Sequence, residues 1–120
     1  MNFTEDKAIY LQIVDYIEEQ ILSGRWKEGE KIVSVRELAS ALEVNANTVM
    51  RSYTELSENE ILVNKRGVGY FVADAATETI RNVRKEHFLQ VELKTLFKKM
   101  KLLHVSLQDV IEKYQLTENK

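Results

Sequence analysis

Apolar residues recur at three- and four-residue intervals near the start of the chain. Between positions 8 and 23 they are Ile9, Tyr10, Ile13, Val14, Ile17 and Ile21, and polar residues fill most positions between them. This spacing places the apolar side chains on one face of an α-helix, which is typical of a helix packed against a core. We therefore predict a helix over residues 8–23, with Gly24 as its C-terminal stop.

Two shorter helices are predicted next, and each has a capping signal at its start. Ser34 and Glu37 have the spacing of a capping box, which predicts a helix over about residues 35–42. Asn45 is a favourable N-cap for a third helix, over residues 46 to about 58. Because only a tight turn separates the two, they have the outline of a helix-turn-helix.

A β-hairpin is predicted behind the third helix. The β-prone triplets at 61–63 and 70–72 flank the sequence NKRGVG, in which Gly67 and Gly69 permit a sharp reversal of the chain. The expected fold is therefore mainly α with a small β-hairpin, a winged helix-turn-helix domain over residues 1–75.

Residues 76–120 form the second predicted part of the chain, a helical tail with two apolar stripes. Leu89, Leu93, Leu96, Met100 and Leu103 make one stripe, and Ile80, Val83, His87 and Val91 make an offset one. A last short helix is predicted over residues 107–114. Two apolar faces need more cover than one neighbour supplies, so we expect the tail to pack on its own domain and on the tail of a second copy.

The third predicted helix has two distinct faces. Val49, Tyr53 and Leu56 share one face and are assigned to the core, whereas Asn47 and Arg51 lie on another. In the DNA major groove, asparagine bonds adenine bidentately and arginine bonds guanine O6 and N7. The sequence reveals no role inside the protein for Asn47 and Arg51, so they are the main candidates for reading bases.

Other polar residues are candidates for contacts with the DNA backbone. They are Asn45 and Thr48 at the start of the third helix, Arg36 near the start of the second, and Lys65 and Arg66 at the hairpin turn. The structural alternative is that Asn45 and Thr48 only cap the helix and that the cations are solvated. The functional interpretation is favoured because all of these residues lie where a winged helix contacts DNA.

Charge and composition restrict the other possibilities. The formal net charge is -2, and residues 24–70 carry seven cations and seven acids, so we expect modest affinity for random DNA and a useful grip only when two copies bind together. No apolar run is long enough to span a membrane, and the N-terminus lacks the pattern of a secretion signal, so a cytoplasmic location is expected.

No pattern of catalytic or ligand-binding residues competes with DNA binding. Cysteine is absent, which excludes disulfides and thiolate chemistry, and the only two histidines are too far apart in sequence to be a helical metal pair. The glycines at 67 and 69 lie in a predicted hairpin and lack the following helix of a phosphate-binding loop. We therefore expect neither an enzyme nor a cofactor or metal site.

Three motifs together resemble a known family. S-V-R-E-L-A, N-x-N-T-V-x-R-x-Y and R-G-x-G-Y-F-V, within residues 7–73, resemble the DNA-binding domain of the GntR family of bacterial transcription regulators. The short two-helix tail is similar to that of the YtrA-like subfamily, which implies a dimerisation tail with little room for an effector. The DNA-binding set implied by the resemblance and the residue patterns is Ser34, Arg36, Asn45, Asn47, Thr48, Arg51, Lys65, Arg66 and Gly67.

The chain departs from the family pattern at a few positions. Ala8, Val33 and Ala46 replace a usual proline, and Glu60 replaces a frequent glycine before the first wing strand. Alanine is an excellent helix former, so the third helix should begin normally at Ala46. If position 60 needs a positive φ, Glu60 adopts it at a cost.

The sequence therefore predicts a homodimeric transcription regulator, a repressor that binds an inverted-repeat operator in double-stranded DNA. It binds through the third helix, called the recognition helix, and through the β-hairpin, called the wing. Two alternatives stay open at this point. In the first alternative, the winged helix serves as a protein-interaction module. In the second, the protein is a DNA-binding regulator that senses a small ligand bound between the tail helices.

Overall fold

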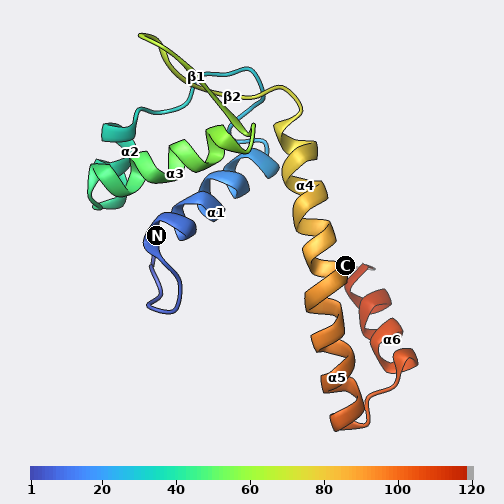
Figure 1. Ribbon diagram of the computed structural model, residues 1–120. Coiled ribbons are helices and arrows are strands. Elements are labelled where there is room, and N and C mark those ends of the chain that lie inside the picture. The colour runs from blue at the N-terminus through green and yellow to red at the C-terminus, as the bar shows by residue number, and fades with distance from the viewer. Residues whose placement is uncertain (119–120) are drawn as a thin grey trace. The chain divides into compact units, whose positions relative to one another are not determined.

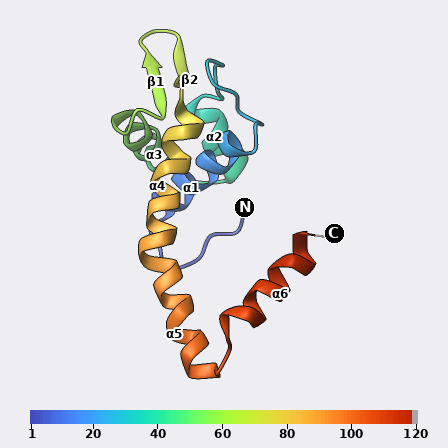
Figure 2. The same cartoon turned by 90° about the vertical axis from the view of Figure 1, so that its right-hand side faces the viewer.

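The computed structural model describes residues 1–118 and divides the chain into two compact units, Met1–Asn82 and a second that begins at Val83. The elements are α1 (Ile9–Leu22), α2 (Val35–Leu42), α3 (Ala46–Glu58), β1 (Leu62–Lys65), β2 (Gly69–Val72), α4 (Ala76–His87), the π-helical turn η1 (Phe88–Glu92), α5 (Leu93–Leu103) and α6 (Leu107–Glu118). In the first unit the β1–β2 hairpin projects away from α1, α2 and α3 (Figures 1 and 2).

The core of the first unit forms where α1 packs along α3. The predicted apolar stripe of α1 supplies Ile13 and Ile17, which are fully buried, and the predicted core face of α3 supplies Val49, Tyr53 and Leu56, which are fully buried as well. The helix periodicity in the sequence thus identified the facing surfaces of both helices correctly.

The helix-turn-helix begins and ends where the capping signals predict. The Ser34 hydroxyl accepts a 3.1 Å hydrogen bond from the Glu37 backbone N–H, and the Glu37 carboxylate accepts one of 3.2 Å from the Ser34 N–H, so both halves of the capping box are present. The Asn45 side-chain oxygen accepts a 2.8 Å bond from the Asn47 N–H at the start of α3. Between the helices, Glu43 adopts a left-handed conformation that closes the turn.

The wing is a two-stranded antiparallel sheet in which Leu62 pairs with Val72 and Lys65 with Gly69. The strands lie at 62–65 and 69–72, slightly closer to the turn than the predicted triplets. Gly67, at φ +77°, supports the reversal, as expected for a residue with no Cβ. The segment before α2 also joins this sheet, because the Ile32 N–H donates to the Tyr70 carbonyl at 2.9 Å.

Glu60, at the entry to the wing, adopts the positive φ whose conformational cost was considered from the sequence. Glu60 has φ +62°, and it follows the last turn of α3 in a Schellman motif, with the Ile61 N–H bonded to the Leu56 carbonyl at 2.9 Å and the Glu60 N–H to the Ser57 carbonyl at 3.1 Å. This position favours glycine, so Glu60 costs the fold conformational energy.

The first turns of α4 belong to the first unit. Ala76 and Ile80 are buried in its core, and the compact unit runs to Asn82, beyond the end at residue 75 assigned from the sequence. The sequence pattern placed Ile80 in a tail stripe, and its burial agrees with the expectation that part of the tail packs on its own domain.

The second unit is helical throughout its described elements. After α4, the π-helical turn η1 leads into α5, and α6 extends to Glu118, beyond the predicted end at residue 114. At the start of α6, Ser106 and Asp109 exchange hydrogen bonds of 3.0 and 3.1 Å. None of the residues of η1, α5 or α6 is buried. Within the described part of the chain, no helix combines the length and apolarity needed to cross a bilayer.

Candidate nucleic-acid interface

The first turn of α3 presents polar groups to solvent. Asn45 is exposed, and its side-chain oxygen serves as the helix cap, which gives Asn45 the structural role that the sequence left open. The Asn47 side chain is exposed and has no hydrogen-bond partner among residues 1–118. Thr48 is half-buried, beside the cap. This end of α3 therefore offers the side-chain amide of Asn47 together with the positive end of the helix dipole.

Arg51 has a partner inside the protein that the sequence did not reveal. Its guanidinium carbon lies 3.7 Å from the centroid of the Tyr10 ring on α1, in a cation–π contact. The contact joins residues that are distant in sequence, and Tyr10 was assigned only to the apolar stripe of α1. Arg51 nevertheless stays exposed and forms no hydrogen bond or ion pair within the described residues.

The start of α2 supplies two more exposed candidates. Ser34 is exposed, and its hydroxyl oxygen accepts the capping bond. Arg36 is exposed in the first turn of the same helix. The backbone N–H and the hydroxyl of Ser34 lower the pKa of Glu37, so this carboxylate stays charged and holds the cap in place at neutral pH. Ser34 and Arg36 are therefore suited to contact a phosphate.

The wing tip carries the remaining candidates. Lys65, Arg66 and Gly67 are exposed around the turn, where the Val68 N–H donates to the Lys65 carbonyl at 2.9 Å. The Lys65 ammonium lies 4.2 Å from the centroid of the Phe71 ring, which the sequence did not indicate. Arg66 is the less restrained of the two cations, since it has no partner within residues 1–118.

Aromatic contacts attach the wing to the recognition helix. The Tyr70 ring on β2 packs edge-on against Tyr53 on α3, with 4.9 Å between ring centroids, and the Tyr70 hydroxyl contacts the Met50 sulfur at 3.7 Å. The recognition helix and the hairpin are therefore held together as parts of one packed unit. The sequence placed Tyr70 in a predicted strand and Met50 in the third helix, but it did not indicate their contact.

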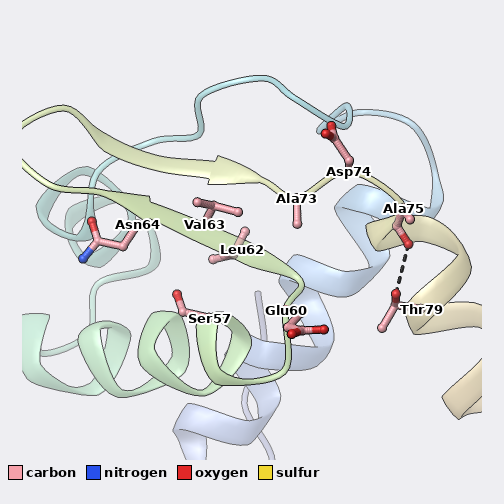
Figure 3. A pocket seen from close by; sticks show the side chains of 9 residues that line it. All are labelled: Ser57, Glu60, Leu62, Val63, Asn64, Ala73, Asp74, Ala75 and Thr79. Carbon is pink, nitrogen blue, oxygen red and sulfur yellow. Dashed lines mark hydrogen bonds between the residues drawn. The ribbon is translucent and has the colours of Figure 1, made fainter.

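A surface hollow of the first unit lies apart from these candidates. Its lining residues come from the C-terminal end of α3 and the turn after it, from β1, and from the connection between β2 and α4 with the first turn of α4. Figure 3 shows them: Ser57, Glu60, Leu62, Val63, Asn64, Ala73, Asp74, Ala75 and Thr79. The hydrogen bond drawn there joins the Thr79 hydroxyl to the Ala75 carbonyl at 3.0 Å. None of the nine is a candidate DNA-binding residue, so this hollow is not part of the interface.

Known proteins resemble this chain in sequence and in structure. Residues 9–72 match the bacterial regulatory proteins of the gntR family. The uncharacterised HTH-type transcriptional regulator YhcF of Bacillus subtilis is 34% identical over 111 residues, which span 92% of this chain and 90% of YhcF. The HTH-type transcriptional repressor YtrA of the same organism is 40% identical over 72 residues, 60% of this chain and 55% of YtrA.

A solved structure extends the similarity to nearly the whole chain. A GntR family transcriptional regulator from Listeria monocytogenes has 35% sequence identity and a TM-score of 0.79, and the match covers 94% of this chain and 97% of that one. The resemblance seen in the three sequence motifs is thereby confirmed, as is the winged helix-turn-helix fold. The chain belongs to the GntR family of bacterial regulatory proteins, and it is a DNA-binding transcription regulator, not an enzyme.

Proposed function

We propose that the protein is a homodimeric repressor that binds an inverted-repeat operator, with the N-terminal turns of α3 in the major groove and the wing against the neighbouring DNA. The carrying observation is the exposure of Asn47 and Arg51, whose side-chain hydrogen-bonding groups have no partners within residues 1–118. Helices of this kind read base edges with side chains in their first turns.

Each candidate residue has a distinct task in this proposal. Asn47 and Arg51 read bases, by analogy with the favoured pairs of asparagine with adenine and arginine with guanine. The groups that hold the DNA backbone are Ser34, Arg36, Thr48, the amide groups at the start of α3 near Asn45, and Lys65, Arg66 and Gly67 of the wing. These contacts fix the register of the protein on the duplex.

The tail helices are proposed as the dimer interface. Leu96, Phe97, Leu102, Leu103 and Leu107 are each at least 42% exposed. Exposed apolar side chains in such number favour burial against another protein surface. A second copy is the partner we propose, because the balanced charge of the DNA-binding region leaves one copy with little affinity for DNA. Two-fold symmetry of the dimer then requires an inverted repeat.

The proposal also includes the sign of regulation and the location of the protein. One similar protein, YtrA, is named a repressor, which favours repression here. A DNA-binding regulator of bacterial genes acts in the cytoplasm, as the sequence analysis expected. We include no effector, since α5 and α6 bury none of their residues and a ligand site needs an enclosing surface.

The decisive test is the selection of bound sequences from random double-stranded DNA, followed by affinity measurements on the selected site. The wild type should enrich a palindromic sequence, and Arg51→Ala should weaken binding by ~1 to 3 kcal/mol and relax preference at one position of each half-site. Arg25→Ala, at an exposed arginine outside the candidate set, is the matched control and should keep both properties.

Two outcomes would contradict the proposal. If no sequence is enriched, the face that carries Asn47 and Arg51 would instead contact another protein, which is the alternative that the balanced charge favours. Enrichment of a site without inverted symmetry would overturn the proposal that a symmetric dimer binds the operator.

A further inference from the structure

We propose that Tyr10 is a positioning residue for base reading, whose ring holds the Arg51 guanidinium with its donor edges turned outward. Tyr10 lies in α1 and outside every DNA-binding set considered above. The inference rests on the proposed function, because it takes Arg51 to contact a base.

The geometry of the contact leaves the arginine donors unused. The guanidinium carbon lies over the Tyr10 ring at 3.7 Å from the centroid. A guanidinium stacked by its flat face keeps its five N–H donors in the plane at its edge, where they remain available for a bidentate acceptor. No hydrogen bond or ion pair within residues 1–118 takes up the donors of Arg51. The ring therefore restrains the group without occupying what it needs to bond guanine.

A second contact fixes the tyrosine to the same turn of α3. The hydroxyl of Ser52, which is fully buried and follows Arg51 directly, donates a 2.7 Å hydrogen bond to the Tyr10 backbone carbonyl. Tyr10 is half-buried, and the next turn of α1 is anchored in the core by Ile13. The ring is therefore a fixed platform relative to the helix that carries Arg51.

The platform lies beside the other base-reading candidate. Tyr10, Asn47, Thr48 and Arg51 line one surface hollow, together with Ala8 and Ile9. A free arginine side chain samples many rotamers, and ordering it on binding costs conformational entropy. Because the ring already restricts the Arg51 side chain in the free protein, less conformational entropy is lost when DNA binds. Loss of the ring should therefore weaken the same base contact that loss of Arg51 abolishes.

The experiment compares full-length variants on the site that the wild type selects from random DNA and on every single-base change of that site. The variants are Tyr10→Leu, Tyr10→Phe, Arg51→Ala and the double variant Tyr10→Leu/Arg51→Ala. The matched control is Tyr16→Leu, at a half-buried α1 tyrosine that packs edge-on against Trp26 at 6.5 Å. Thermal unfolding of each variant identifies losses due to misfolding, and Tyr10→Met replaces Tyr10→Leu if the latter does not fold.

Tyr10→Leu should reduce discrimination about two- to fivefold, and only at the base pair where Arg51→Ala abolishes it. The double variant should bind no more weakly than Arg51→Ala. Tyr10→Phe keeps an aromatic ring and should retain wild-type discrimination, and Tyr16→Leu should leave the base preferences unchanged. A Tyr10→Leu loss that is equal at all base pairs, or that adds fully to that of Arg51→Ala, would overturn this inference alone. Selection of no sequence by the wild type would overturn the proposed function and this inference with it.

Discussion

The phenol of Tyr53, on α3, donates a 2.8 Å hydrogen bond to the backbone carbonyl of Val33, in the segment that precedes α2. The Tyr53 side chain is fully buried, and burial raises the pKa of its hydroxyl, which stays protonated as a donor at neutral pH. This one bond ties the entry of the helix-turn-helix to the middle of its recognition helix. It thereby fixes how Ser34 and Arg36 lie relative to α3.

Tyr53→Phe should lower the free energy of unfolding by ~1 to 2 kcal/mol, since it leaves the Val33 carbonyl without its partner in a partly buried place. Urea denaturation at neutral pH measures this loss. Tyr16→Phe is the matched control, because the Tyr16 hydroxyl has no hydrogen bond within residues 1–118, and it should be nearly neutral. Equal stability of Tyr53→Phe and the wild type would show that the bond contributes nothing net.

Glu28 joins the loop after α1 to the start of α4. Its carboxylate accepts hydrogen bonds from the Ala75 N–H at 3.0 Å and the Thr77 N–H at 3.2 Å. The Thr77 hydroxyl and these two N–H groups lower the pKa of Glu28. A lowered pKa in the folded state stabilises the protein above the ordinary glutamate pKa, and that stability is lost as the pH falls through the lowered value.

Glu28→Gln should therefore destabilise the protein at pH 7 and flatten the loss of stability between about pH 5 and pH 3. Urea midpoints measured across this range give the slope. The control is Glu30→Gln, at a neighbouring exposed acid whose side chain has no hydrogen bond in the described chain. An unchanged slope in Glu28→Gln would mean that other carboxylates account for the acid sensitivity.

Local signals in the sequence were sufficient for much of the fold and insufficient for the packing of the site. The starts of α2 and α3 follow from Ser34, Glu37 and Asn45, whose caps act within a few residues. The stacking of Arg51 on Tyr10 depends on how α1 crosses α3, which no local pattern encodes. For the same reason the periodicity of the tail did not reveal that Ile80 belongs to the first unit.

Glu60→Gly should stabilise the protein by about 1 kcal/mol, because glycine adopts the left-handed conformation of this position without the steric cost of a Cβ. Thermal unfolding measures the gain. Asn59→Gly is the matched control, since Asn59 has φ -90° and glycine there should destabilise. Loss of stability in Glu60→Gly would mean that the Glu60 side chain contributes more than the strain costs. Operator affinity should stay unchanged, because Glu60 is not in the candidate interface.

The boundary of the first unit and the proposed role of the tail are testable with two truncations. A chain that ends at Asn82 keeps Ala76 and Ile80 in the core and should fold, as circular dichroism and a cooperative urea transition would show. A chain that ends at Ala75 loses both side chains, and the loss of a buried isoleucine alone costs about 2 to 5 kcal/mol, so this chain should be largely unfolded.

Sedimentation velocity then tests the interface. The chain that ends at Asn82 should be a monomer with much weaker operator binding than the full chain, because it no longer gains from joint binding of two half-sites. Full-length Leu103→Lys should also weaken the dimer, since Leu103 is 71% exposed and a charge there opposes burial against a partner without disturbing its own core. Glu112→Lys, at an exposed polar position of α6, is the charge control. A dimeric truncated chain would place the interface within residues 1–82.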